Sequence, residues 1–464
     1  MTIFAREPGR GLRAPHTVLV VGSGAREHAL CWKLAAEAGV KRVLVAPGNA
    51  GMGDVAETVP QVAAGDGAGL LELCGRERVD LVVIGPEGPL VDGVGDRLRT
   101  AGVATFGPDA AAAQIEGSKA FCRDIADAAG IPMAEGKAFD RLEPAYRYGQ
   151  GLGLPVVVKA DGLAAGKGVS ICRSSDQLRA ALADALDEQL FGPAGARVVV
   201  ERALEGDEAS VIAICDARNA ICLPAARDHK RLGDADTGPN TGGMGAYSPL
   251  DDLPDEAAAT VVRRFHLPAL RELAARGAPF RGALYAGLML TPQGPRLLEF
   301  NARLGDPETQ AMVPRLDVPL AALLLAAAED RLGEAAAALG IPVGSVLRTK
   351  PDATVAVVLA APGYPASPLL GEPVAGLAEA RVEGATVFSA GVARASGAVG
   401  VATGPTVPGG DGLVTAGGRV ATVVGRGRAL EEAREQAYRA ADRITFPGRQ
   451  LRRDIGLQRV AINA

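Results

Sequence analysis

Aromatic residues and histidine are scarce in this sequence. Aromatic residues are 4% of the 464 positions, only one of them Trp, and there are four His. So few aromatic side chains leave few platforms on which single-stranded nucleic acid could stack. A net charge of −5 gives no electrostatic reason for such binding either. We therefore expect no nucleic-acid partner.

Cysteine is sparse and scattered. The six cysteines form no C-x-x-C pair, which together with the few histidines disfavours both a zinc site and a disulfide framework. Buried, reduced thiols of a cytoplasmic protein fit better. The positions are Cys31, Cys74, Cys122, Cys172, Cys215 and Cys222.

Long apolar runs are also missing. No stretch of about 18 apolar residues is free of charges, so we expect no membrane span. Residues 1–14 lack the apolar core of about 7–15 residues that a signal peptide needs. We interpret residues 1–15 as a disordered lead and expect the chain to be a monomer.

Hydrophobic residues are plentiful, at 48% of the chain, and can fill several cores. At about 150 residues per domain, the length predicts about three domains. Within residues 16–118, apolar runs at 17–21, 42–45, 81–84 and 103–106 alternate with helical segments. This alternation predicts an α/β domain with a parallel sheet and helices on both faces.

Two glycine turns end strands of this predicted sheet. Gly22-Ser23-Gly24 opens a helix, whose first amides could bind a phosphate. Gly85-Pro86-Glu87 ends another strand at the carboxyl edge, where open α/β sheets bind ligands. The alternative is that both turns only make tight connections.

The first turn matches a dinucleotide fingerprint poorly. Glu27 occupies the third glycine position, and residues 46–49, after the second strand, offer no acid for a ribose. A nicotinamide-dependent oxidoreductase is therefore disfavoured.

A strand at residues 297–300 carries the clearest chemistry. Glu299 and Asn301 are two apart, so they share one face of the strand, and Arg303 continues it. Mg²⁺ takes such oxygen ligands and commonly shares them with nucleotide phosphates. Arginine can stabilise a transferring phosphoryl group. A solvated strand face with a salt bridge is the alternative.

Other polar segments also indicate a site for a nucleotide and its phosphates. Residues 160–168 hold three glycines, with Lys159 and Lys167, and could fold over phosphates, although they are not a P-loop. A hairpin turn with two solvated lysines is the alternative. Residues 201–204 could present backbone groups to an adenine, and Glu208 could accept from ribose hydroxyls. The long polar run 228–245 is typical of a binding loop.

These motifs occur in one order along the chain. They read VVGSGAREHAL, APGNAG, GPEGPL, EGSKAF, VVKADGLAAGKGV, DHKR, DTGPNTGGMGAYSP, YAGLML and LEFNARLGDPETQ. Over about residues 17–460 the chain resembles the phosphoribosylamine–glycine ligase (glycinamide ribonucleotide synthetase) family, ATP-grasp enzymes of purine synthesis. The resemblance implies that ATP, glycine and 5-phosphoribosylamine give ADP, phosphate and the glycinamide ribonucleotide through glycyl phosphate, with Mg²⁺ or Mn²⁺ as the metal.

The resemblance also implies roles for individual residues. Glu299 and Asn301 would bind the metal, and Arg303, Lys159 and Asp228 would act in catalysis. ATP would be held by Lys119, Lys159, Gly162, Gly166, Lys167, Gly168, Glu201, Leu204 and Glu208. Glycine and 5-phosphoribosylamine would be held by Gly22, Ser23, Gly24, Arg26, Gly85, Pro86, Glu87, Lys230, Arg231, Asn240, Thr241, Gly242 and Asp306.

The implied architecture has three parts: an N-terminal parallel-sheet preATP-grasp domain at 16–118, an α+β ATP-grasp domain at 119–330 with a mobile lid at about 137–204, and a small mixed β/α domain at 331–464. Some positions depart from the family's usual pattern. Ala25 replaces a glycine, Arg227 replaces a Gln, and residues 286–290 offer no second metal-binding acid. Ser389 and Pro362 also differ, and we assign no chemistry to the last domain.

Two alternatives to the ligase remain open. A carboxylating ATP-grasp enzyme would require bicarbonate, and the run from DHKR to GGMGAYSP speaks against it. A nucleotide-binding regulator without catalysis would bind ATP without turning it over. The joint presence of Lys159, Glu299, Asn301 and Arg303 disfavours that reading.

Overall fold

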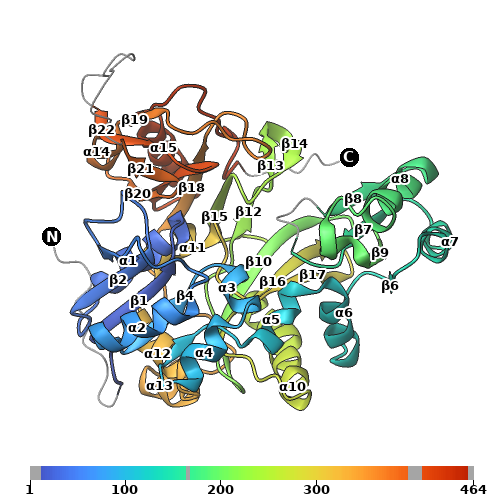
Figure 1. The fold of residues 1–464 in the computed structure, drawn as a ribbon, viewed down its shortest axis with the longest axis horizontal. Coiled ribbons are helices and arrows are strands. Elements are labelled where there is room, and N and C mark those ends of the chain that lie inside the picture. Colours follow the sequence, from blue (N-terminus) through green and yellow to red (C-terminus); the bar gives the residue numbers. More distant parts are fainter. Residues whose placement is uncertain (1–11, 164–167, 396–409, 458–464) are drawn as a thin grey trace.

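The computed structural model describes residues 12–163, 168–395 and 410–457 (Figure 1). Its N-terminal part is a five-stranded sheet in the order β3-β2-β1-β4-β5, in which every neighbouring pair is parallel. The predicted parallel sheet is thus confirmed. Its elements are β1 (Thr17–Gly22), α1 (Ala25–Ala35), β2 (Arg42–Pro47), β3 (Glu57–Thr58), α2 (Gly67–Glu77), β4 (Leu81–Ile84), α3 (Glu87–Val91), α4 (Val94–Thr100), β5 (Thr105–Phe106) and α5 (Ala110–Gly117).

A second unit projects to the right in Figure 1, and we call it the lid. Its antiparallel sheet has the order β6-β9-β7-β8. Its apolar residues, such as Val158, Leu178 and Val200, form a core of their own. The lid contains β6 (Gly136–Phe139), α7 (Leu142–Leu152), β7 (Val156–Ala160), β8 (Val169–Cys172), α8 (Ser175–Leu186), η1 (Gly192–Ala196) and β9 (Val198–Arg202), and α6 (Lys119–Ala128) leads into it.

A second antiparallel sheet faces the lid, in the order β11-β10-β16-β17. The strand predicted at 297–300 is confirmed as part of β17 (Gly294–Asn301), which forms a hairpin with β16 (Gly282–Thr291). A π-helical turn, η3 (Val262–His266), lies within the helical segment 255–275. The other elements here are β10 (Asp207–Cys215), β11 (Ala220–Cys222), α9 (Asp255–Val261), α10 (Leu267–Ala275), α11 (Glu308–Met312), η4 (Val313–Arg315), α12 (Leu320–Ala328) and α13 (Leu332–Ala338).

The C-terminal part is built on a sheet that it shares with the middle of the chain, in the order β12-β15-β18-β23-β20. The expected polar loop 228–245 is therefore not irregular throughout. It contains β12 (Arg227–Asp228), β13 (Arg231–Gly233), η2 (Asp234–Asp236) and β14 (Thr237–Asn240), followed by β15 (Gly245–Ser248). The remaining elements are β18 (Ala353–Ala360), β19 (Pro373–Ala375), α14 (Leu377–Val382), β20 (Thr386–Ser389), β21 (Val392–Arg394), β22 (Gly410–Thr415), β23 (Arg419–Gly427) and α15 (Leu430–Ala441).

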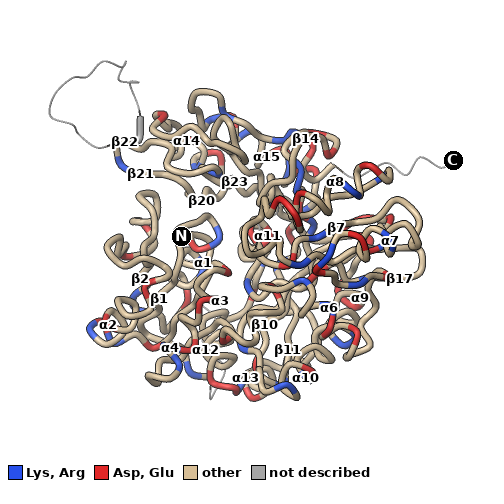
Figure 2. Tube along the Cα trace, turned by 45° about the vertical axis from the view of Figure 1, so that its right-hand side comes forward, with Lys and Arg blue, Asp and Glu red and all other residues tan. Residues whose placement is uncertain are grey.

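Charged residues of both signs are interspersed along the trace (Figure 2). All six cysteines are buried and none forms a disulfide, as expected. Among the described residues, no helix combines the length and the hydropathy that crossing a membrane requires.

Candidate active site

A cleft of about 2430 Å³ is lined by residues from the N-terminal sheet, the lid, the sheet facing the lid and the C-terminal part. Single-ligand pockets are usually about 300–1,000 Å³, so the cleft has room for more than one substrate. Of the described residues expected in the site, only Gly85 does not line it. Gly85 instead packs against the Glu27 side chain, which leaves no room for a Cβ. Gly166 and Lys167 lie outside the described residues.

The expected metal ligands lie beside a lysine. Lys119 Nζ is 2.6 Å from Glu299 Oε2, and Asn301 is nearly buried on the same strand. Burial raises the pKa of Glu299, but the ammonium groups of Lys119 and Lys230 outweigh burial and bring the pKa well below its usual range. Glu299 is therefore an anionic oxygen donor at neutral pH. In the described part of the chain, no group of three or more His, Cys, Asp or Glu residues could hold a metal ion.

Lys159 is held at the base of the lid. Its Nζ is 2.7 Å from Glu201 Oε2 and donates to the carbonyl of Leu298 at 2.9 Å. Leu298 is the extra residue of a bulge in β17, so its carbonyl lies outside the regular pairing. The other oxygen of Glu201 accepts from Arg123 at 2.6 Å. Both carboxylate oxygens of Glu201 thus have cationic partners, whereas the adenine contact expected of residues 201–204 is one through their backbone.

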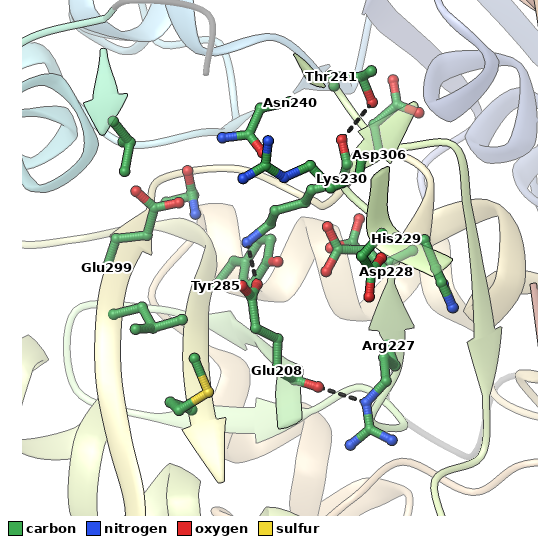
Figure 3. Close-up of a pocket in the computed structure, with 18 of the residues that line it drawn as sticks. Glu208, Arg227, Asp228, His229, Lys230, Asn240, Thr241, Tyr285, Glu299 and Asp306 are labelled. Carbon is green, nitrogen blue, oxygen red and sulfur yellow. Dashed lines mark hydrogen bonds and ion pairs between the residues drawn. The ribbon is translucent and has the colours of Figure 1, made fainter. Parts of the chain in front are cut away.

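A third lysine–carboxylate pair lines the cleft, between Glu208 Oε2 and Lys230 Nζ at 2.6 Å (Figure 3). Figure 3 shows Asp228 and Tyr285 on the same wall. Burial raises the pKa of Asp228 to about 7, against the opposing effect of Lys230 and with support from Glu308 and Glu208. Asp228 can therefore exchange a proton near neutral pH.

Arg227 lies beside this wall, and each of its three guanidinium nitrogens donates a hydrogen bond. Its guanidinium donates to the Glu208 carbonyl at 2.6 Å, to Tyr247 Oη at 3.0 Å and to Asp252 Oδ2 at 2.7 Å. The positive charge that Arg227 brings to this position, where the resemblance expects a Gln, is thus matched by Asp252.

Arg303 is fixed by two carboxylates from the N-terminal part. Its Nε is 3.1 Å from Glu87 Oε2, and its Nη2 is 3.3 Å from Glu116 Oε1. Glu116 is buried and also accepts from the Ala302 amide at 2.7 Å. Sequence reasoning assigned no role to Glu116, although it directly precedes the Gly-Ser-Lys119 segment.

The first glycine turn is closed by Glu27. The Gly24 amide donates to Glu27 Oε2 at 2.7 Å, and Arg26 Nε donates to Oε1 at 2.6 Å. Gly22, at φ +132°, could not carry a Cβ, which would lie 2.6 Å from Glu27 Cγ. Glu27 therefore occupies an amide that a pyrophosphate would use, in agreement with the poor dinucleotide fingerprint.

The C-terminal part also contributes side chains to the cleft, although sequence reasoning assigned no chemistry to it. Arg419 donates to Asp306 Oδ2 at 2.7 Å and to the Gly242 carbonyl at 2.6 Å. The Gly242 amide donates to Tyr364 Oη at 2.9 Å. Only the Gly417-Gly418 turn before Arg419 could have drawn attention to this position.

Two antiparallel sheets enclose a cleft in which lysines face a Glu-x-Asn pair, and this arrangement defines an enzyme of the ATP-grasp class. Models of the phosphoribosylglycinamide synthetase N domain, ATP-grasp (A) domain and C domain match residues 16–116, 117–309 and 354–458. The chain belongs to the phosphoribosylglycinamide synthetase family.

Individual relatives agree with this assignment. The chain is 45% identical to the phosphoribosylamine–glycine ligase of Mesorhizobium japonicum over 96% of this chain and 98% of that one. It is 42% identical to the ligase of that name from Vibrio vulnificus, with the same coverage of both chains. The crystal structure of the Thermotoga maritima phosphoribosylamine–glycine ligase superposes with a TM-score of 0.76 at 32% identity, over 94% of this chain and 99% of that chain.

A more distantly related protein has a similar fold. The biotin carboxylase domain of the Hydrogenobacter thermophilus 2-oxoglutarate carboxylase superposes with a TM-score of 0.64 over 95% of this chain and 92% of that chain. At 17% identity this likeness concerns the fold alone.

Proposed function

We propose that this chain ligates glycine to 5-phosphoribosylamine, giving N1-(5-phosphoribosyl)glycinamide, ADP and phosphate, as in de novo purine biosynthesis. The main observation in support is that one cleft contains two groups of residues. The first is Lys119, Lys159 and the Glu299–Asn301 pair, and the second is the polar hairpin β13–β14. The first group suits a metal-bound triphosphate, and the second suits small polar substrates.

The reaction proceeds in two balanced steps. A carboxylate oxygen of glycine attacks the γ-phosphorus of ATP, giving glycyl phosphate and ADP. The amine nitrogen of 5-phosphoribosylamine then attacks the acyl carbon; phosphate leaves, and the nitrogen loses a proton. Lys119 and Lys159 neutralise the triphosphate, and Arg303 stabilises the transferring phosphoryl group. Asp228, whose pKa is about 7, accepts the proton.

The metal site fits a shared Mg²⁺ ion. Glu299 is anionic and Asn301 supplies an amide oxygen on the same strand, so the protein offers hard oxygen ligands but few of them. Phosphates and waters complete such shells for Mg²⁺. When bound, the ion neutralises charge on the phosphates. Mn²⁺ takes similar ligands and is expected to substitute.

The lid protects the intermediate. Glycyl phosphate hydrolyses if water reaches it, so a segment that covers the phosphates has a chemical purpose. Gly162 and Gly168, which the structure describes, line the cleft. Leu204 and Glu208, where the lid joins β10, also line the cleft, and we assign them to the nucleotide.

The purified chain should release ADP only when glycine and 5-phosphoribosylamine are both present. Equal ADP release without glycine would contradict the proposal. A requirement for bicarbonate would favour the carboxylating alternative, and tight ATP binding without turnover would favour a regulator. We further propose a cytoplasmic monomer with domain limits at 16–118, 119–330 and 331–464.

A further inference from the structure

The tip of the substrate hairpin β13–β14 (residues 234–236) is bonded to the end of the described chain. We call this end, residues 452–455, the tail. Arg452 Nη1 donates to Asp236 Oδ1 at 2.8 Å and to the Arg231 carbonyl at 3.2 Å. The same guanidinium makes two bonds to Asp454, at 2.7 and 2.6 Å. Figure 1 shows β13 and β14 beside the C-terminal part.

Backbone bonds reinforce the connection. The Ala235 amide donates to Asp454 Oδ2 at 2.8 Å, and the Arg453 amide donates to Asp234 Oδ1 at 2.7 Å. Ala235 and Asp236 both have φ of 54°, in the left-handed region that non-glycine residues rarely adopt. The tip therefore has an unfavourable backbone conformation that its bonds to the tail hold in place.

The tail is itself anchored. Tyr438 Oη, on α15, donates to the Arg452 carbonyl at 2.9 Å and accepts from the Ile455 amide at 3.1 Å. The Arg452 side chain is only 1% exposed, and its carboxylate partners compensate its buried positive charge. The connection thus runs from α15 through the tail to the tip of the hairpin.

The hairpin and the residues that hold it all border the cleft. Arg231, Asp236 and Asn240 line it, and so do Arg452 and Asp454. The hairpin base is closed by Thr241, whose amide and hydroxyl both donate to the Lys230 carbonyl, at 2.7 and 2.9 Å. With the base closed, the tail contacts decide how firmly the tip is held.

We propose that Arg452 and Asp454 are positioning residues for the ligation: they hold the hairpin so that Arg231 and Asn240 meet the substrates in a fixed geometry. This inference rests on the proposed function, since that proposal assigns the hairpin to glycine and 5-phosphoribosylamine. Ordering the hairpin before binding removes an entropic cost from substrate binding.

The contacts of Arg452 and Asp454 with the hairpin, which we call the clamp, can be tested by amide hydrogen exchange without measuring activity. In the ligand-free full chain, Arg452→Met and Asp454→Asn should accelerate exchange across residues 231–240 by about tenfold. Arg439→Gln is the control, because the exposed Arg439 side chain pairs with Glu435 within α15. Arg452→Lys keeps the charge but loses the planar fork, so it should restore only part of the protection.

Steady-state kinetics test the positioning role. Both variants should raise KM for glycine or 5-phosphoribosylamine by about tenfold, or ~1.4 kcal/mol, while KM for ATP changes less than twofold. If Arg452→Met does not fold, Asp236→Asn serves instead, since the Asp236 side chain is 45% exposed. Unchanged exchange in the folded variants would overturn the clamp. Faster exchange with unchanged KM for both substrates would overturn the positioning role. Failure of the proposed function is distinguishable, because the unaltered chain would then show no glycine-dependent ADP release.

Discussion

Lys119 and Glu299 form an ion pair, with Nζ 2.6 Å from Oε2, between the start of α6 and the end of β17. A cation proposed for the triphosphate thus neutralises a carboxylate proposed for the metal. Lys230 with Glu208 and Lys159 with Glu201 repeat the arrangement at 2.6 and 2.7 Å. Metal-bound ATP can replace the Lys119–Glu299 pair with matched contacts to both partners, metal to carboxylate and phosphate to ammonium.

Substitution of Glu299 by Gln should lower kcat by at least about 10²–10³-fold, the usual loss when one charge-stabilising group is removed. The same change frees Lys119, so binding of ATP without metal should tighten. ADP release and calorimetric ATP titrations with and without Mg²⁺ measure the two effects. Glu205→Gln, at an exposed acid that does not line the cleft, is the control. Near-normal turnover of Glu299→Gln would remove the metal assignment.

Substitution of Glu116 by Gln should lower kcat by about tenfold or more and leave KM for ATP nearly unchanged. The reason is that the new side-chain amide oxygen could still accept from the Ala302 amide, while Arg303 would lose an anionic partner. Kinetics with ATP varied at saturating glycine and 5-phosphoribosylamine measure the split. A parallel rise in KM for ATP would mean that Glu116 acts on nucleotide binding and not through Arg303.

Local pattern was sufficient for the strands and for the Glu299–Asn301 pair. Apolar runs bounded by turn residues predicted β4 at the residues where it occurs, 81–84, and the strand at 297–300 that lies within β17. The same-face relation of Glu299 and Asn301 follows from the two-residue repeat of a strand. These features depend on neighbours in sequence, so they can be predicted from sequence.

Long-range relations could not be predicted in this way. Glu116 and Arg303 are far apart in the chain, and only the tertiary fold brings them together. β12 and β15 are short and lie around a glycine-rich run, so nothing local indicated that they join β18 in one sheet. Arg419 begins an apolar strand and gave no chemical signal, although it reaches Asp306.

The pH dependence of activity should show Asp228. Its pKa is raised to about 7, so kcat/KM should rise with pH through about 7 as the carboxylate becomes able to accept a proton. Asp228→Asn should lower activity and remove that ascending limb. The effect of Asp228 on stability has the opposite sign: its contribution to the free energy of unfolding decreases as pH rises. An unfolded Asp titrates near ~3.9, so the contribution of Asp228 is complete below that pH and is lost as pH rises through about 7. Asp228→Asn should therefore raise the melting temperature more at pH 8 than at pH 5.

The histidines should make the fold sensitive to acid. Burial lowers the pKa of His28, His229 and His266 to about 4 in each case, from the ordinary value of 6.5. Between these two pH values the unfolded chain binds more protons than the folded one, so stability falls as pH decreases from about 6.5 to 4. Each histidine contributes up to ~1.4 kcal/mol per pH unit within that window.

His28 offers a direct test of this dependence at the contact between α1 and β20. Its Nδ1 accepts from the Ser389 amide at 2.9 Å, and its ring packs edge-on against Phe388. An amide oxygen in His28→Asn can take over the bond from Ser389 but cannot be protonated in this range. The variant should therefore lose some stability at pH 7, while its free energy of unfolding should decline less steeply than that of the unaltered chain between pH 6.5 and 4. Urea unfolding at several pH values measures both slopes. Equal slopes would show that His28 does not account for any of the acid sensitivity.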